Sequence, residues 1–255
     1  MKKGYYRTDA VILNSTDYGE SDSIITFYTE RYGKLNGIAK GARRSRRRFV
    51  ANLDPVSRSR LYIFQTGRSD LVRIEDATLV EGFPALKADI ERYGSACYMV
   101  ELLAEMTRDG QASPVVFDIL LGFLRLLEEG GEEGLVMRFF EIKMLSALGY
   151  LPHLGGCVVC RNALNGEKVF FSSEKGGVVC KRCVEPPGDT IPVSAGTAGF
   201  LAMAARLPLE KLRRLVPSPL VASESERVLA DFIRYQIGKE LKSRRFIQKL
   251  KGLSA

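Results

Sequence analysis

Four cysteines carry the strongest chemical signal in this 255-residue sequence. They form two Cys-x2-Cys pairs, Cys157 with Cys160 and Cys180 with Cys183, and 19 residues separate the pairs. Two such pairs can place four thiolates around one zinc ion, and four protein ligands leave no coordination position for a catalytic water. The spacing therefore predicts one structural zinc per chain.

Turn-forming residues surround both cysteine pairs. Two glycines precede each pair, and residues 168–172 between the pairs read as a short strand, so the segment resembles a zinc ribbon. Redox or disulfide chemistry is the alternative for cysteines so spaced. Met1 leads directly into a strand-like segment without a signal peptide, which favours a reducing cytoplasm, where cysteine pairs bind metal more often than each other.

The remaining cysteine and the only histidine add little chemistry. Cys97 lies alone in an apolar, helical stretch, which predicts packing. His153 lies four residues before Cys157 and is an alternative metal ligand. A single histidine, no clustered acidic metal site and no Gly-x4-Gly-Lys-Ser/Thr loop argue against an enzyme, so no catalytic residues are expected.

A dense basic run follows the third strand-like segment. Residues 40–48 read Lys-Gly-Ala-Arg-Arg-Ser-Arg-Arg-Arg, with five arginines in six positions. Guanidinium groups bind phosphate through a planar fork of donors, so the run predicts contact with DNA of any sequence. The alternative is a solvated loop. The predicted DNA-binding residues are Lys34, Lys40, Arg43, Arg44, Arg46, Arg47, Arg48, Arg68 and Arg73.

Three further arginines could extend this surface: Arg31, Arg58 and Arg60. Three tyrosines could offer faces for base stacking, although tyrosines on strands are more often packed: Tyr28, Tyr32 and Tyr62.

Charge is unevenly distributed along the sequence. The formal net charge of +8 divides into +6 for residues 1–80, −6 for 81–150, +1 for 151–190 and +7 for 191–255. This pattern suits basic terminal parts that meet a polyanion and a central part that does not. No apolar run approaches the roughly 18 residues of a membrane span, so a membrane protein is not expected.

Five strands are predicted in the first 80 residues, over 8–14, 22–29, 34–40, 59–65 and 71–80, because these segments are rich in β-branched and aromatic residues and turn signals separate them. This count fits a small barrel, either an OB-fold or an SH3-like barrel.

From Pro84 onward the apolar spacing becomes helical. One long helix is expected through residues 86–106, a second from Ser113-Pro114 to Leu127, a third over 134–148 and a fourth over 194–207. A long final helix is expected from Ser223, where Ser223-x-x-Glu226 matches a capping box.

Several of these segments, taken in order, resemble the bacterial RecO family of recombination and repair mediators. They are Thr8-Asp-Ala-Val-Ile-Leu13, Tyr32-Gly-Lys34, Lys40-Gly-Ala-Arg43, Arg138-Phe-Phe-Glu141, Leu148-Gly-Tyr150 with the first cysteine pair, and Leu241-Lys-Ser-Arg-Arg-Phe246. The resemblance implies an α+β multidomain fold, in which a five-stranded OB-fold barrel precedes a helical domain that carries a four-cysteine zinc-ribbon insertion. The expected domains are 1–80 (OB-fold), 81–150 (helical, first part), 151–190 (zinc module) and 191–255 (helical, C-terminal part).

The resemblance also implies a function and partners. It implies binding of single- and double-stranded DNA, annealing of complementary strands, and loading of RecA with RecR onto DNA coated by single-stranded DNA-binding protein, in the bacterial cytoplasm at the nucleoid. Lys242, Arg244 and Arg245 have the charge to receive the acidic tail of single-stranded DNA-binding protein. The charged face of an exposed helix is the alternative for this cluster, and a zinc-ribbon adaptor in transcription or translation is the alternative for the whole chain.

Overall fold

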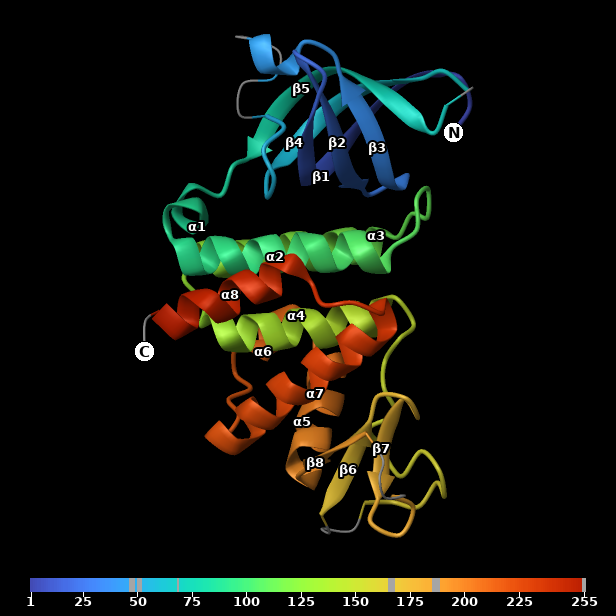
Figure 1. The fold of residues 1–255 in the computed structure, drawn as a ribbon, viewed down its shortest axis with the longest axis vertical. Coiled ribbons are helices and arrows are strands. Elements are labelled where there is room, and N and C mark those ends of the chain that lie inside the picture. Colours follow the sequence, from blue (N-terminus) through green and yellow to red (C-terminus); the bar gives the residue numbers. More distant parts are fainter. Residues whose placement is uncertain (46–48, 50–51, 68, 165–167, 185–188, 254–255) are drawn as a thin grey trace. The chain divides into compact units, whose positions relative to one another are not determined.

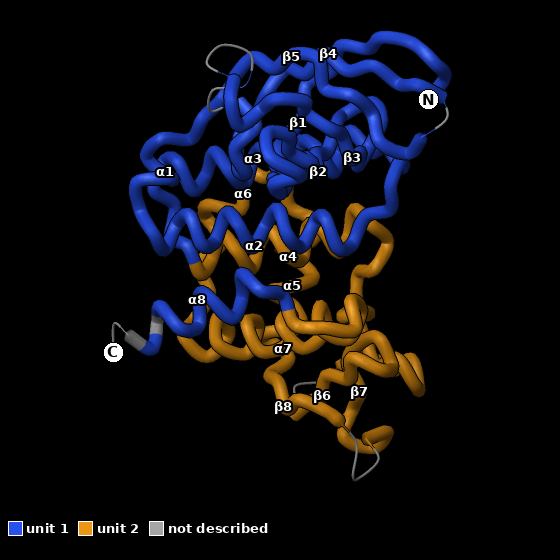
Figure 2. Tube along the Cα trace, turned by 45° about the horizontal axis from the view of Figure 1, so that its top comes forward, with its two compact units in different colours: residues 1–133, 241–255 blue, residues 134–240 orange. Residues whose placement is uncertain are grey.

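The computed structural model describes residues 1–45, 49, 52–67, 69–164, 168–184 and 189–253. The chain forms two compact units, residues 1–133 with 241–255 (unit 1) and residues 134–240 (unit 2), which Figure 2 shows in different colours. The division into four domains expected from the sequence stays a prediction, and each unit is described by itself below.

Unit 1 begins with a closed five-stranded barrel (Figure 1). Its strands are β1 (Gly4–Tyr18), β2 (Asp22–Thr29), β3 (Gly33–Ala39), β4 (Arg58–Gln65) and β5 (Leu71–Glu81). All five were predicted, and β1 is longer than expected at both ends, because residues 4–7 pair with β4 and residues 15–18 pair with β2.

The strand order around the barrel identifies the OB-fold. The order is β1-β2-β3-β5-β4, and β4 pairs with β1 to close the ring. The β3–β5 pair is parallel while the other neighbours are antiparallel, which is the Greek-key arrangement of an OB-fold and excludes the SH3-like alternative.

Alternating residues of every strand fill the barrel core. Ile12, Phe27, Leu61 and Ile63 are completely buried there. Gly37 on β3 is required at its position because a β-carbon would lie 2.9 Å from the side chain of Ile74 on β5. The alternate positions on the same strands face outward, and charged and aromatic side chains occupy many of them.

Among the described residues, four α-helices complete unit 1: α1 (Pro84–Ala88), α2 (Ile90–Met106), α3 (Pro114–Glu128) and α8 (Lys242–Leu253). Ser113 caps α3, as predicted, and its Oγ accepts from the N–H of Val116 at 3.4 Å. The prediction of one continuous helix across 86–106 was wrong in detail: Asp89 is extended and its carboxylate caps a new helix by accepting from the N–H groups of Glu91 and Arg92.

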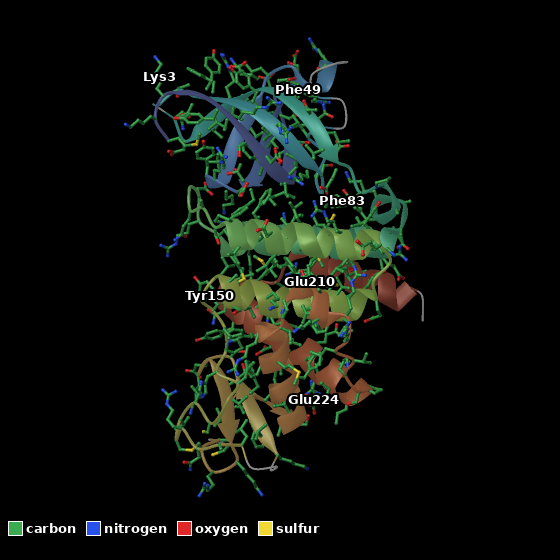
Figure 3. The ribbon with its side chains drawn as sticks, turned by 180° about the vertical axis from the view of Figure 1, so that it is seen from behind. Lys3, Phe49, Phe83, Tyr150, Glu210 and Glu224 are labelled. Atoms are coloured by element: carbon green, nitrogen blue, oxygen red, sulfur yellow. The ribbon has the colours of Figure 1, made fainter. Side chains whose placement is uncertain are left out.

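Unit 2 contains four helices and a small sheet among its described residues: α4 (Glu133–Ala147, whose first residue belongs to unit 1), α5 (Ala195–Arg206), α6 (Leu209–Leu212) and α7 (Pro219–Ile237), with β6 (Val169–Ser172), β7 (Gly177–Cys180) and β8 (Thr190–Val193). The sheet is antiparallel with the order β7-β6-β8. Glu224 on α7, labelled in Figure 3, accepts from the backbone and side chain of Ser194 and so secures the start of α5.

The final helix expected from Ser223 was wrong in both its start and its length. Ser218 is the N-cap, since its Oγ accepts from the N–H of Val221, and Ser223 is an exposed residue inside α7. Gly238, at φ 77°, ends α7, and α8 begins at Lys242 as a separate helix. The capping-box pattern Ser223-x-x-Glu226 was misleading, because an earlier serine, Ser218, is followed by Pro219. Proline is favoured in the first turn of a helix, so the helix begins there.

None of the helices in the described ranges is both long enough and apolar enough to cross a bilayer.

Candidate metal centre and nucleic-acid surface

The four cysteines come together in unit 2 as the spacing predicts. The sulfur atoms of Cys157, Cys160, Cys180 and Cys183 all lie within 4.8 Å of one another, and the Cys160 and Cys180 sulfurs are 3.8 Å apart. A tetrahedral ion with metal–sulfur bonds of about 2.3 Å needs sulfur–sulfur edges of about 3.8 Å. The donor set and its spacing therefore fit a single tetrahedral metal ion.

Tight turns hold each cysteine pair in this geometry. The N–H of Arg161 donates to the carbonyl of Cys157, and that of Cys183 donates to the carbonyl of Cys180, both at 2.9 Å. Arg161 adopts φ 64°, an uncommon conformation for a residue with a β-carbon. Strand β7 ends at Cys180, and the N–H of Val158 donates to the carbonyl of Val178 on β7 at 2.7 Å, so this hydrogen bond joins the first cysteine pair to the strand that carries the second.

Backbone donors favour a thiolate at Cys157. Burial raises the pKa of this thiol, but the N–H groups of Cys180, Cys160 and Val159 donate to its sulfur and lower the pKa to about 6. Hydrogen bonding with Cys180, followed by desolvation and the other sulfurs, raises the pKa of Cys183 to about 12. All four sulfur atoms can be thiolates at this separation only if a cation between them balances their charge.

His153 and Cys97 take no part in this centre. The backbone of His153 pairs with β7, its N–H donating to Gly176 and its carbonyl accepting from Val178, and the group of potential metal ligands among the described residues contains only the four cysteines. Gly177 permits this pairing, because a β-carbon there would lie 2.4 Å from the His153 carbonyl oxygen. Cys97 is a half-buried residue of α2.

The described part of the basic run lies on an exposed loop of the barrel. Arg43 and Arg44 form the 3₁₀ turn that follows β3, and their side chains make long ion pairs with Asp17 (3.5 Å) and Glu20 (3.6 Å). These pairs are exposed and weak, so both guanidinium groups stay accessible to phosphate. Lys40 is exposed beside them. Arg46, Arg47, Arg48 and Arg68 lie outside the described residues.

Two basic residues from the sequence prediction are engaged in the fold of unit 1. Lys34 Nζ donates to the carbonyls of Ala104 and Thr107 at 2.6 Å each and therefore caps the C-terminal end of α2. Arg58 donates to Asp9 and to Glu81, at 2.8 Å in both cases. We therefore leave Lys34 and Arg58 out of the nucleic-acid surface. Arg73 is exposed, although it is paired with Glu75.

The three candidate tyrosines have different environments. Tyr28 is 1% exposed, and Tyr32 is half-buried against the barrel core with its ring edge-on to Tyr6. Tyr62 is exposed on the outer face of β4. Only Tyr62, among these three, can offer a ring face to a base.

Sequence analysis missed the side chains that surround Tyr62. Tyr5 and Arg7 on β1, and Phe64 on β4, share its face of the barrel. The available signal was period-two alternation, in Tyr5-x-Arg7-x-Asp9 and in Arg60-x-Tyr62-x-Phe64, which places each set on one face of its strand. The register that joins the two sets could not be read from the sequence.

The C-terminal basic cluster lies at the start of α8. Glu101 on α2 caps this helix by accepting from the N–H groups of Lys242 (3.0 Å) and Ser243 (2.8 Å). Lys242 and Arg245 are exposed, and Phe246 beside them keeps 45% of its surface exposed. The cluster therefore combines cationic and apolar surface.

Comparisons with known proteins match nearly the whole chain. The family model described as "Recombination protein O N terminal" matches residues 1–83, and "Recombination protein O C terminal" matches residues 87–245. A protein of Syntrophus aciditrophicus (strain SB) named "DNA repair protein RecO" is 34% identical over 251 residues, which are 97% of each chain. A protein of the same name from Myxococcus xanthus (strain DK1622) is 35% identical over 250 residues, 96% of this chain and 98% of the relative.

Proposed function

The chain belongs to the RecO family, and from that premise we propose that it is a DNA-binding mediator of recombination that acts without catalysing a reaction. The family places it in DNA repair and recombination. The observation that carries the proposal is that both family models match in order across a chain whose first part is an OB-fold barrel with an exposed basic loop. The proposed site of action is the bacterial cytoplasm, at the nucleoid.

The proposed mechanism is electrostatic. Lys40, Arg43, Arg44 and Arg73, together with the arginines at 46–48 and 68, neutralise phosphates of single- and double-stranded DNA. Screening the repulsion between two strands lets complementary strands anneal, and base pairing supplies the specificity. With RecR, the same protein promotes the loading of RecA on DNA coated by single-stranded DNA-binding protein.

A strand-annealing assay on DNA coated with single-stranded DNA-binding protein tests the mediator function. A mediator accelerates annealing on coated strands, whereas a generic basic domain does so only on naked strands. Activity confined to naked DNA would contradict the proposal. A DNA affinity that hardly depends on salt would favour the alternative, a zinc-ribbon adaptor that binds protein.

The basic loop is tested by an arginine double variant. Replacing Arg43 and Arg44 with alanine is expected to weaken binding to unrelated sequences equally and to flatten the slope of log affinity against log salt by up to about 0.7–0.9 per lost contact. Replacing two exposed arginines of unit 2, Arg206 and Arg214, is the matched control. Extending the variant to Arg46, Arg47 and Arg48 tests the whole run, and an unchanged slope would place the DNA site elsewhere.

We also propose that α8 receives the acidic C-terminal tail of single-stranded DNA-binding protein. Lys242, Arg244 and Arg245 supply charge complementarity beside the exposed ring of Phe246, where the apolar end of the tail can dock. Reversing the three cations to glutamate should abolish binding of the isolated tail peptide.

Charge reversal of Lys211, Arg213 and Arg214 in unit 2 is the control for this experiment, because these residues are also basic and exposed. Equal peptide affinity in both triple variants would contradict the site. An equal loss of naked-DNA binding in the α8 variant would make the cluster a second DNA contact instead.

The metal centre is proposed to hold one structural zinc ion. Four thiolate donors at tetrahedral spacing are the ligand set that zinc prefers, and complete protein ligation leaves no open position. Bound zinc would supply folding free energy to residues 157–183, whose described part contains only the short strands β6 and β7.

A further inference from the structure

Three aromatic rings form a ladder on the outer face of the barrel. The ring of Tyr62 on β4 stacks on that of Tyr5 on β1, with centroids 5.3 Å apart and an angle of 7° between the planes. Tyr5 also contacts Phe64, at 4.6 Å, and the guanidinium of Arg73 lies over Phe64, at 5.6 Å from its centroid. We call these three rings the aromatic ladder.

Tyr62 is the open end of the aromatic ladder. Tyr5 contacts two rings, those of Tyr62 and Phe64, whereas Tyr62 contacts only that of Tyr5 among the described aromatic pairs. The described residues place no further aromatic ring against Tyr62, and 43% of the residue is exposed. A planar group of nucleobase size can therefore continue the stack at this end.

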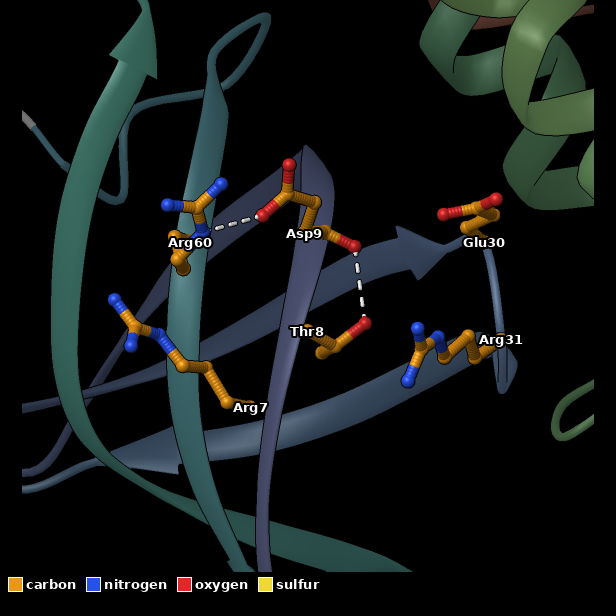
Figure 4. A pocket seen from close by; sticks show the side chains of 6 residues that line it. All are labelled: Arg7, Thr8, Asp9, Glu30, Arg31 and Arg60. Carbon is orange, nitrogen blue, oxygen red and sulfur yellow. Dashed lines mark hydrogen bonds and ion pairs between the residues drawn. The ribbon is translucent and has the colours of Figure 1, made fainter.

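A pocket rich in arginine lies on the same face of the barrel (Figure 4). Its volume is about 430 Å³, and it is lined by Arg7, Thr8 and Asp9 of β1, Glu30 and Arg31 after β2, and Arg60 of β4. Arg7 pairs across the strands with Tyr62, and Asp9 pairs with Arg60. The pocket therefore begins at the residue pair that contains Tyr62, the open end of the aromatic ladder.

The charges in this pocket favour an anion. Asp9 is fully engaged, because it accepts from Arg58 and from Arg60, each at 2.8 Å. Desolvation opposes ionisation of this carboxyl, but the hydrogen bonds from the two arginines outweigh it and lower its pKa, so Asp9 is charged and neutralised. Arg7 and Arg31 form no side-chain ion pair within the described ranges, which leaves two guanidinium groups for a ligand against the single remaining carboxylate of Glu30.

We propose that this face binds single-stranded DNA, with one base stacked on Tyr62 and the adjacent phosphates held by Arg7 and Arg31. The inference rests on the proposed DNA-binding function and deepens it, because the basic loop at 40–48 contacts phosphates alone and cannot distinguish a single strand from a duplex. A duplex keeps its bases inside the helix, so Tyr62 can receive a base only from a single strand. The face thus gives the protein a way to prefer unpaired DNA.

Stacked tyrosines on a sheet also have a purely structural use, since cross-strand aromatic pairs stabilise a barrel. That role accounts for the contact between Tyr5 and Tyr62. It does not account for the exposure of Tyr62 beside Arg7 and Arg31, for which the described residues supply no side-chain ion pair.

A single tryptophan tests the contact directly. The chain contains no tryptophan, so Tyr62→Trp introduces one indole at the proposed stacking position. Adding oligo(dT) is expected to quench its emission, and adding a duplex of equal length is expected to leave the emission nearly unchanged. Tyr235→Trp on α7, where the native residue is 52% exposed, is the control for non-specific quenching.

Affinity measurements give an independent readout. Tyr62→Ala should weaken oligo(dT) binding about 5- to 150-fold and change duplex binding less than about twofold, whereas Tyr62→Phe should keep the affinity of the wild type. Arg7→Ala and Arg31→Ala should each reduce the salt slope for oligo(dT) by about 0.7. Circular dichroism of each variant verifies that the barrel is folded.

The outcomes separate this inference from the function on which it rests. If the wild type binds neither DNA form, the proposed function fails and this site with it. If the wild type binds both forms but Tyr62→Trp is quenched no more than Tyr235→Trp, and Tyr62→Ala binds oligo(dT) normally, the stacking site is refuted and DNA binding through the basic loop stands.

Discussion

Arg58 joins three strands of the barrel through one guanidinium group. It extends from β4 to Asp9 on β1 and to Glu81 on β5, and Arg125 on α3 also donates to Glu81. Its side chain is 22% exposed and those of Asp9 and Glu81 are 17% and 26% exposed, so solvent screens these pairs only in part. This arginine was a candidate for DNA contact by its charge alone, and its acidic partners became visible only with the strand register.

Asp9→Asn is expected to destabilise the barrel by about 1–2 kcal/mol near neutral pH, since it removes the charged acceptor of two hydrogen bonds from arginine. The pKa of Asp9 is lowered in the folded state, so its contribution is present above its unfolded pKa, near 4, and is lost as pH falls through the lower folded value. The difference between wild type and variant should therefore shrink below about pH 4. Hydrogen exchange of β1 and β4, corrected for intrinsic rates, measures it.

Asp17→Asn provides the matched control, because the Asp17 side chain is 68% exposed and lies 3.5 Å from Arg43. Little change in exchange is expected at any pH. A pH-independent difference for Asp9→Asn would show that the residue acts through packing and not through its charge.

Lys34 illustrates how a basic residue in a basic region can serve the fold. Lys34→Met is expected to destabilise unit 1 by about 1.5–3 kcal/mol, because two carbonyls at the end of α2 lose a charged donor. The salt slope of DNA binding should stay unchanged, in contrast to the arginine double variant. Thermal unfolding and a salt titration on the same preparation test both points, and a reduced slope with unchanged stability would return Lys34 to the DNA surface.

At the scale of elements, the start of α7 depends on its N-cap residue, Ser218. Ser218→Ala should cost about 1 kcal/mol of stability in unit 2, because it removes the side chain that caps α7. Ser223→Ala should change stability by less than about 0.5 kcal/mol, since Ser223 is an exposed interior residue of the helix. Urea unfolding of the two variants ranks them, and a larger loss for Ser223→Ala would restore the capping box expected from the sequence.

The elements themselves were largely predictable, and their ends and pairings were not. Enrichment in β-branched and aromatic residues between turn signals predicted every strand of the barrel, and helical apolar spacing together with serine caps predicted the helix starts at Ser113 and Ser194, because these signals are local. The helix ends at Asp89 and Gly238 were missed, because the helical spacing of apolar residues continues on both sides of each. The aromatic ladder depends on the pairing of Tyr5 with Phe64, and pairing between β1 and β4 is a long-range property.

At the scale of the molecule, the metal centre and the barrel belong to different compact units. Elemental analysis of metal-replete protein should give one zinc per chain. Cys157→Ser, or removal of the metal by a chelator, should raise hydrogen exchange across residues 157–183 while exchange in β1–β5 stays unchanged. DNA affinity through the barrel should persist.

Three results would contradict these expectations for the metal centre and its independence from the barrel. Protein that contains no zinc, or a disulfide between Cys157 and Cys160 in reduced protein, would refute the metal assignment. Loss of protection in the barrel strands of Cys157→Ser would show that the two units unfold together.

Unit 1 consists of two chain segments, and this has a consequence during synthesis. The barrel and α1–α3 leave the ribosome first, yet Gly94 and Glu101 of α2 receive their partners only from α8, which lies more than a hundred residues later. Unit 2 is continuous and can fold on the nascent chain before unit 1 is complete. We expect a chain truncated before residue 241 to expose the surface of α2 around Gly94, against which Phe246 and Ile247 lie, and exposed surface of this kind is what chaperones and proteases act on.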